Sequence, residues 1–268
     1  MNNIQFFKKN KIDLDMTGIT ITAADNVATS NGQAAVDFLR NRNNTSGWAT
    51  TDSDDSAITS LEINMGSQVD VDTLILVNHN FKEFTIQYWN GSSYVDFSTP
   101  INQTTNAETT SRYQFTKVGT SKIKIIITAT QIANDEKRMS QFIVTEILGT
   151  FEMQPEIKPQ LDKNRKVTQY LSGKKNIARS LESFTVDFTM NNVTSNNDLT
   201  LIETMFDSYF GFLVWLCGGT QDQYLSQRRG YRLEDVFLMN VANEYKPQYE
   251  ESRYKHGLRV DVKLVEVV

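Results

Sequence analysis

The sequence predicts a mainly β protein, with an N-terminal β-sandwich or jelly roll followed by a β-barrel or sandwich that one α-helix flanks. Three observations lead to this prediction. Residues 61–65 and 84–88 alternate apolar and polar side chains, as strands with one buried face do. Asn90-Gly91 then precedes another apolar run, and this dipeptide favours the type I′ turn of a β-hairpin. A convincing apolar stripe at helical spacing is found at 199–209.

The first domain is expected to cover residues 1–152. Its strands are predicted at 17–22, 61–65, 74–77, 84–88, 94–97, 113–115, 122–128 and 142–148. Long polar loops are expected at 41–55, 99–111 and 131–140. His79 lies between Asn78 and Asn80 at a strand end, where we expect it to hydrogen-bond the backbone of a turn. Gly149 and the two prolines that follow it mark the domain boundary.

A basic segment at 153–182 separates the two domains. Seven basic residues and a single acid, Asp162, fall within 158–179, with few large apolar residues and with Gly173 near the centre. We expect a long hairpin or an extended arm. A solvated linker is the alternative, because runs of like charge often remain in solvent.

The second domain is expected at 183–268. Phe184, Val186 and Phe188 alternate with polar residues and predict a strand. Ser195, followed three residues later by Asp198, resembles a capping box at the start of the helix. Further strands are predicted at 212–217, 232–240 and 257–268.

Composition excludes several classes of function. The 268 residues carry a net charge of −5, so the overall field repels nucleic acid and anionic membranes. The single cysteine, Cys217, permits neither an intrachain disulfide nor a cysteine-based metal site. No apolar segment has the length of a membrane helix or follows the basic N-terminus as in a signal peptide, so we expect synthesis in the cytoplasm without secretion.

No catalytic motif is recognisable, and we expect neither enzymatic activity nor a cofactor. The two histidines, His79 and His256, fall in different predicted domains. Asp52, Asp54 and Asp55 could supply oxygen ligands to Ca²⁺, and a solvated acidic loop is the alternative. An Asp54–Asp55 pair is also the candidate for a cryptic glycoside hydrolase.

Three aromatic residues are candidates for stacking on sugar rings. Trp48 lies in a polar loop, and Trp89 and Tyr94 flank the Asn-Gly turn. The alternative is that Trp48 closes the base of the sandwich and that Trp89 covers its edge.

Residues 19–150 resemble the discoidin, or coagulation-factor C-type, β-sandwich. The resemblance is carried by Trp48, the strands at 60–66 and 69–76, Asn80, and the segments at 86–88, 91–94 and 144–149. It implies a scaffold that binds glycans or lipid surfaces through loops at one end, in some members with Ca²⁺. The loops of this chain lack an evident pair of apolar spikes, which argues against membrane insertion.

The second domain resembles the tail-tube-related barrel of the distal tail and hub proteins of tailed bacteriophages. The resemblance is carried by residues 184–190, 199–209, 212–216 and 258–268. It implies a structural virion protein that forms a ring with copies of itself and contacts tail-tube and hub proteins, while the first domain contacts host glycans. The residues expected at the ring interface are basic: Lys163, Arg165, Lys166, Lys174, Lys175, Arg179, Arg228, Arg229 and Arg232. Two alternatives stay open, a stand-alone carbohydrate-binding or adhesion module and an accessory domain of a glycoside hydrolase.

Overall fold

The computed structural model confirms the mainly β fold class. It describes residues 4–24, 36–42, 47–51, 53–152, 155, 157–162, 165–169, 175–179, 183–208, 211–215, 236–252 and 255–267. The chain forms two compact units. The first consists mainly of Phe7–Ile147, and the second of Asn3–Phe6, Leu148–Val214 and Phe237–Val268. A short N-terminal segment, Asn3–Phe6, therefore belongs to the second unit.

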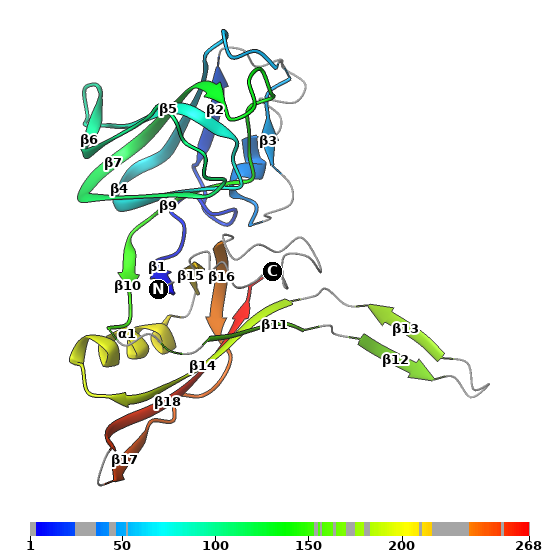
Figure 1. Ribbon diagram of the computed structural model, residues 1–268, viewed down its shortest axis with the longest axis vertical. Helices are drawn as coiled ribbons and strands as arrows, with labels where there is room; N and C mark the ends of the chain where they lie inside the picture. Colours follow the sequence, from blue (N-terminus) through cyan, green and yellow to red (C-terminus); the bar gives the residue numbers. More distant parts are fainter. Residues whose placement is uncertain are drawn as a thin grey trace. The chain divides into compact units, whose positions relative to one another are not determined.

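The first unit is an antiparallel β-sandwich (Figure 1). Its main sheet has the strand order β2-β4-β7-β5-β6, with β9 paired to β4, and β3 and β8 form a separate two-stranded sheet. The elements are β2 (Thr20–Ala24), the 3-10 helix η2 (Val36–Arg40), β3 (Trp48–Ala49), β4 (Thr59–Val77), β5 (Phe81–Trp89), β6 (Tyr94–Gln103), β7 (Ser111–Thr130), β8 (Arg138–Met139) and β9 (Gln141–Thr145).

Two long strands, β4 and β7, connect the two layers of the sandwich. β4 pairs with β7 over Thr59–Asn64 and again over Val69–Leu76, with irregularities between Asn64 and Val69 and between Val71 and Thr73. The first stretch of β4 also pairs with β2, and the second pairs with β9. The sequence predicts two strands at 61–65 and 74–77, but both runs belong to β4. Gly66, with φ of 73°, lies at the break, where it provides the left-handed backbone conformation that a side chain disfavours.

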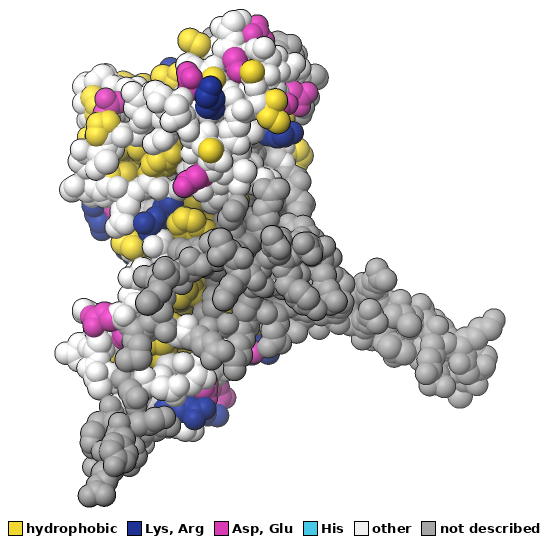
Figure 2. Space-filling view, viewed as in Figure 1, with side chains coloured by type: hydrophobic (Ala, Val, Ile, Leu, Met, Phe, Trp, Pro, Cys, Tyr) yellow, Lys and Arg dark blue, Asp and Glu magenta, His cyan; other side chains and the backbone are white. Residues whose placement is uncertain are grey.

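The core of the sandwich is built from the alternating residues that the sequence predicts to be buried. Leu61, Ile63 and Ile86 are fully buried, and the rings of Phe97 and Phe115 lie 4.0 Å apart between centroids. Outside the core, Figure 2 shows acidic and basic side chains interspersed over the described part of this unit on the face in view. The apolar residues of each alternating run are therefore the ones that the strand buries, and its other face remains in contact with water.

The second unit contains an eight-stranded sheet of order β10-β1-β15-β16-β18-β14-β11, with β17 paired to β18 (Figure 1). The strands are β1 (Gln5–Phe7), β10 (Ile147–Gly149), β11 (Ile157–Asp162), β14 (Ser183–Val193), β15 (Phe212–Trp215), β16 (Val236–Val241), β17 (Gln248–Ser252) and β18 (Lys255–Glu266). β1 was not expected, because its run of two apolar residues is too short to show a period. Phe6 holds β1 in place, because the Phe6 ring packs edge-on against Phe151 and Phe212, with centroid distances of 5.2 and 6.0 Å.

The helix α1 (Asn196–Asp207) begins three residues before the predicted start. Ser195 is the N-cap, and its side chain accepts hydrogen bonds from the backbone N–H groups of Asn197 and Asp198. The side chain of Asp198 does not close the expected capping box. It is buried and accepts from the backbone N–H of Glu152 at 2.8 Å, which fastens the start of the helix to the preceding segment. In the part of the chain that the structure describes, no helix has the length and apolarity to cross a membrane.

The basic segment between the domains forms a hairpin rather than an unstructured linker. β12 (Arg165–Gln169) and β13 (Lys175–Arg179) pair antiparallel in a two-stranded sheet of their own. β11 precedes this hairpin in the chain and β14 follows it. These two strands pair with each other, and Asp162 lies opposite Ser183.

Glu146 fastens the N-terminal segment to the closing strand of the first unit. Its carboxylate has a side-chain exposure of 6% and lies 3.1 Å from the ammonium groups of Lys8 and Lys11 and 2.6 Å from that of Lys117. Burial alone would raise the pKa of Glu146, but the hydrogen bonds from these three lysines lower it to about 2. Glu146 is therefore ionised throughout the ordinary pH range.

Glu146→Gln is expected to lower the free energy of unfolding by about 2 kcal/mol at pH 7, because three ammonium groups lose their shared acceptor and two of them are half exposed. The native carboxyl has a pKa below that of an unfolded one, so its contribution is complete above about pH 4.5 and is lost as the pH falls through about 2. Urea unfolding of both proteins at pH 7 and pH 3 measures this. A wild-type advantage that does not shrink at pH 3 would contradict the assignment.

Candidate functional site

Loops at one end of the sandwich enclose a pocket of about 450 Å³. Its lining comes from β3, from the turn between β4 and β5, and from the segment that leads from β7 into β8. The polar lining side chains include Asn78, Asn80, Gln131, Asp135 and Arg138. These residues are distant in sequence, and the strand ends of the sandwich bring them together.

The turn between β4 and β5 is held by His79, as the sequence predicts. Asn78 adopts φ of 52°, and the backbone N–H of Phe81 donates to Nδ1 of His79 at 3.2 Å. Nε2 of His79 lies 3.0 Å from Oγ of Ser111 on the neighbouring strand β7. Burial lowers the pKa of His79 to about 4, so the ring is neutral near pH 7. His79 is thus a structural residue of the pocket wall.

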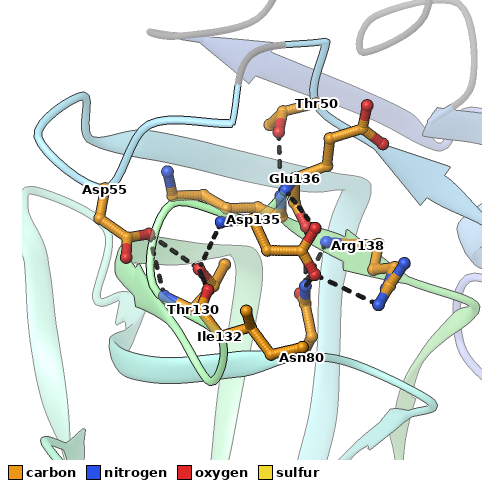
Figure 3. Close-up of polar contacts among 9 residues, drawn as sticks. Thr50, Asp55, Asn80, Thr130, Ile132, Asp135, Glu136 and Arg138 are labelled. Carbon is orange, nitrogen blue, oxygen red and sulfur yellow. Dashed lines mark hydrogen bonds and ion pairs between the residues drawn. The ribbon is translucent and has the colours of Figure 1, made fainter.

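Asn80, Asp135 and Arg138 form a polar network at the pocket (Figure 3). The side-chain amide of Asn80 donates to Oδ2 of Asp135 at 3.2 Å and to the carbonyl oxygen of Glu136 at 2.7 Å, and its Oδ1 accepts from the backbone N–H of Arg138. Nη2 of Arg138 donates to the same Oδ2 of Asp135 at 3.2 Å. Arg138 and Asp135 keep side-chain exposures of 57% and 27%, so both orient polar groups toward solvent.

Ile132 gives the pocket an exposed apolar group beside this network. Its exposure is 69%, the highest of any large apolar residue that the structure describes. The loop that carries it is not free, because Oγ1 of Thr130 donates to the carbonyl oxygen of Ile132 at 2.7 Å. An apolar side chain on a loop whose backbone is held, next to polar groups, offers both kinds of contact that a small polar ligand needs.

The acidic loop predicted to hold Ca²⁺ uses its carboxylates within the fold. Asp52 lies outside the described residues. Asp54 accepts from the backbone N–H and the hydroxyl of Ser56. Asp55 accepts from the backbone N–H and hydroxyl of Thr130 and from the backbone N–H of Asn134. Among the described residues, no three of His, Cys, Asp and Glu converge as a metal site would require.

The same contacts bear on the hydrolase alternative. The Asp54 carboxylate accepts from Ser56 within its own loop, and the Asp55 carboxylate accepts from Thr130 and Asn134, so both carboxylates of that alternative take part in hydrogen bonds of the fold.

The three aromatic candidates take different positions. Trp48 is fully buried in the core of the sandwich, so its ring is not exposed for stacking on a sugar. Trp89 and Tyr94 pair edge-to-face at 5.3 Å on β5 and β6 and are partly exposed. The ammonium groups of Lys122 and Lys124 lie 5.7 Å from the centroids of the Trp89 and Tyr94 rings, respectively. A sugar stacking there would compete with these cations.

The residues expected at a ring interface are only partly within the described structure. Lys163, Lys174, Arg228, Arg229 and Arg232 lie outside it. The backbone places Arg165 and Lys166 on β12, opposite Arg179 and the residue before it on β13, and Lys175 opposite Gln169.

Sequence reasoning missed the network of Asn80, Asp135 and Arg138 as a site. These residues are 55 and 58 positions apart, and no local motif joins them. Two features of the sequence could have indicated this site. One is the polar loop at 131–140 after the strand predicted at 122–128, and the other is the pair Asn78 and Asn80 at the end of the strand predicted at 74–77.

His79→Gln is expected to remove an acid-dependent loss of stability. The folded ring has a pKa of about 4 against 6.5 when unfolded, so its contribution is complete above pH 6.5 and is lost as the pH falls toward 4. Between pH 7.5 and pH 4, the wild type should lose roughly 3 kcal/mol more unfolding free energy than the variant. Chemical denaturation at both pH values measures the difference. Equal losses in the two proteins would show that His79 is not buried in its neutral form.

No protein-family model and no curated protein sequence matches the chain. Solved structures are similar to about half of it. A chitosan-binding module of a chitosanase/glucanase from Paenibacillus sp. IK-5 is 18% identical, over 52% of this chain and 98% of that one, with a TM-score of 0.42.

Two further structures show a comparable likeness. A module from Clostridium perfringens in complex with GalNAc-β-1,3-galactose is 11% identical, over 49% of this chain and 97% of that one, with a TM-score of 0.38. A GH29 fucosidase from Ruminococcus gnavus is 14% identical, over 54% of this chain and 27% of that one, with a TM-score of 0.40.

Proposed function

We propose that the first unit binds a glycan in the pocket at its loop end, without catalysing a reaction. The observation that carries this proposal is the polar network of Asn80, Asp135 and Arg138 beside the exposed side chain of Ile132. Sugar hydroxyls both donate and accept hydrogen bonds. Asp135 can accept from one hydroxyl while Arg138 donates to its neighbour.

The geometry supports a small polar ligand in particular. The pocket volume of about 450 Å³ lies within the range of small-molecule sites and suits one or two sugar residues. Ile132 provides an apolar surface for the C–H groups of a sugar ring, which stacking on an exposed aromatic ring would otherwise supply. Because Asn80 bonds both to Asp135 and to the backbone of Arg138, the polar groups are fixed before a ligand arrives, and little ordering entropy is lost on binding.

Arg138→Ala is expected to weaken glycan binding at least tenfold, because it removes charged hydrogen-bond donors from the pocket while the backbone bond to Asn80 remains. Isothermal titration calorimetry of the full chain with chitosan oligosaccharides and with GalNAc-β-1,3-galactose measures this. Trp89→Ala is the matched control, since Trp89 ends the strand β5 that begins near Asn80, roughly 25 Å away. Loss of binding in the control but not in Arg138→Ala would move the site to Trp89 and Tyr94.

A second proposed function concerns the second unit and the basic hairpin. We propose that the chain is a subunit of a ring at the distal end of a bacteriophage tail, located in the virion and in contact with tail-tube and hub proteins. The support for this is the β12–β13 hairpin, which is a sheet separate from the main one and carries Arg165, Lys166, Lys175 and Arg179. A basic hairpin of this kind is suited to bind an acidic surface of another subunit. The first unit would then be the glycan-binding part of an assembled particle.

Replacing residues 163–182 by Asn-Gly is expected to abolish self-association. Asp162 and Ser183 already lie opposite each other on β11 and β14, so a two-residue turn can join them and leave the main sheet intact. Mass photometry of both proteins should show rings for the wild type and monomers for the variant. A monomeric wild type would favour a stand-alone binding module.

A further inference from the structure

Lys137 is a fully buried lysine among the pocket loops, and the polar network of the proposed site does not use its side chain. Its ammonium group donates to the carbonyl oxygen of Asp54 at 2.9 Å and to that of Ala57 at 3.1 Å. Both acceptors belong to the loop before β4. A lysine is almost never fully buried unless its charge is paired, so this burial needs a compensating role.

The charge of Lys137 is balanced by the loop that it holds. Burial lowers the pKa of Lys137, whereas the nearby carboxylates of Asp55 and Asp54 act in the opposite direction. Asp55 in turn accepts from Thr130 and Asn134, on the segment that leads to Lys137 itself. The Lys137 ammonium bonds the loop before β4, and the Asp55 carboxylate of that loop bonds the segment before Lys137. The two groups therefore connect the same pair of segments.

Lys137 is also fixed through its backbone to Thr50, the residue that follows the pocket-lining strand β3. Its N–H donates to Oγ1 of Thr50 at 3.0 Å, and its carbonyl oxygen accepts from the N–H of Thr50 at 2.9 Å. Arg138 follows directly and pairs with Ala49 across β8 and β3. The position of Arg138 thus depends on where the side chain and backbone of Lys137 are held.

We propose that the Lys137 ammonium group is a built-in cation of the loop end, which fixes the loop at 53–57 and positions Arg138 and Asp135 for the ligand. The positioning part of this proposal rests on the proposed glycan site. An ammonium between two backbone carbonyls performs the task that a bound metal ion performs in many loops, because both neutralise converging oxygen atoms. The proposal therefore predicts that this loop needs no divalent cation to hold the site for a glycan.

Lys137→Met tests this role, because methionine keeps much of the aliphatic length and removes the charge and the donors. We expect amide hydrogen exchange at 53–57 to accelerate by about tenfold or more and glycan affinity to fall by a similar factor. Lys137→Arg retains a charged donor on a larger, planar group and should recover part of both losses. Lys82→Met, at an exposed lysine near the start of β5, is the matched control and should change neither.

Three results would overturn the proposal. The first is unchanged exchange at 53–57 in Lys137→Met, and the second is an equal loss in Lys137→Arg and Lys137→Met. The third is a loss of wild-type glycan affinity on adding EDTA. If the wild type binds no glycan in the titrations, the proposed function fails, but hydrogen exchange at 53–57 still decides whether Lys137 holds the loop.

Discussion

The pairing of β4 with β7 is the constraint on which the first unit depends. β4 and β7 pair along two stretches, the first beside β2 and the second beside β9, so a single pair of strands links both parts of the sandwich. The irregularity between Asn64 and Val69 allows this, because it lets one strand leave the first layer and continue in the second. The core residues of both stretches then face the same interior.

The loop-end pocket follows from where these strands stop. β4 ends before Asn78, β5 begins after Asn80, and β7 ends before the segment that carries Asp135. Strand ends therefore bring together polar residues that the chain separates, while the sheet behind them keeps them in place. Binding residues on loops that a rigid scaffold fixes are common in proteins, because loops tolerate polar side chains and irregular backbone.

Polar groups within the first unit are satisfied largely by the chain itself. Glu146 forms ion pairs with three lysines, and the ammonium group of Lys137 is hydrogen-bonded among the pocket loops. Buried charges are stable only when such partners are present, and removing one partner exposes the full desolvation cost of the other. The same residues that order the loops thereby make this unit sensitive to single substitutions of charge.

The sequence alone predicted most strands of the first unit, the amphipathic helix and most of the core, because period is a local property. It placed the hairpin turn after Trp89 correctly but not its type. Gly91 has positive φ and Asn90 does not, and residues 90–93 form a four-residue loop in which Oδ1 of Asn90 accepts from the backbone N–H groups of Ser92 and Ser93. The sequence also predicted a hairpin or an extended arm in the basic segment, with a solvated linker as the alternative, and β12 and β13 pair there. Only the tertiary structure decided that Trp48 and Lys137 are buried, that Phe6 belongs to the second unit, and that Asn80 meets Asp135 and Arg138. These outcomes depend on contacts between distant segments, and no local pattern encodes which loops will meet.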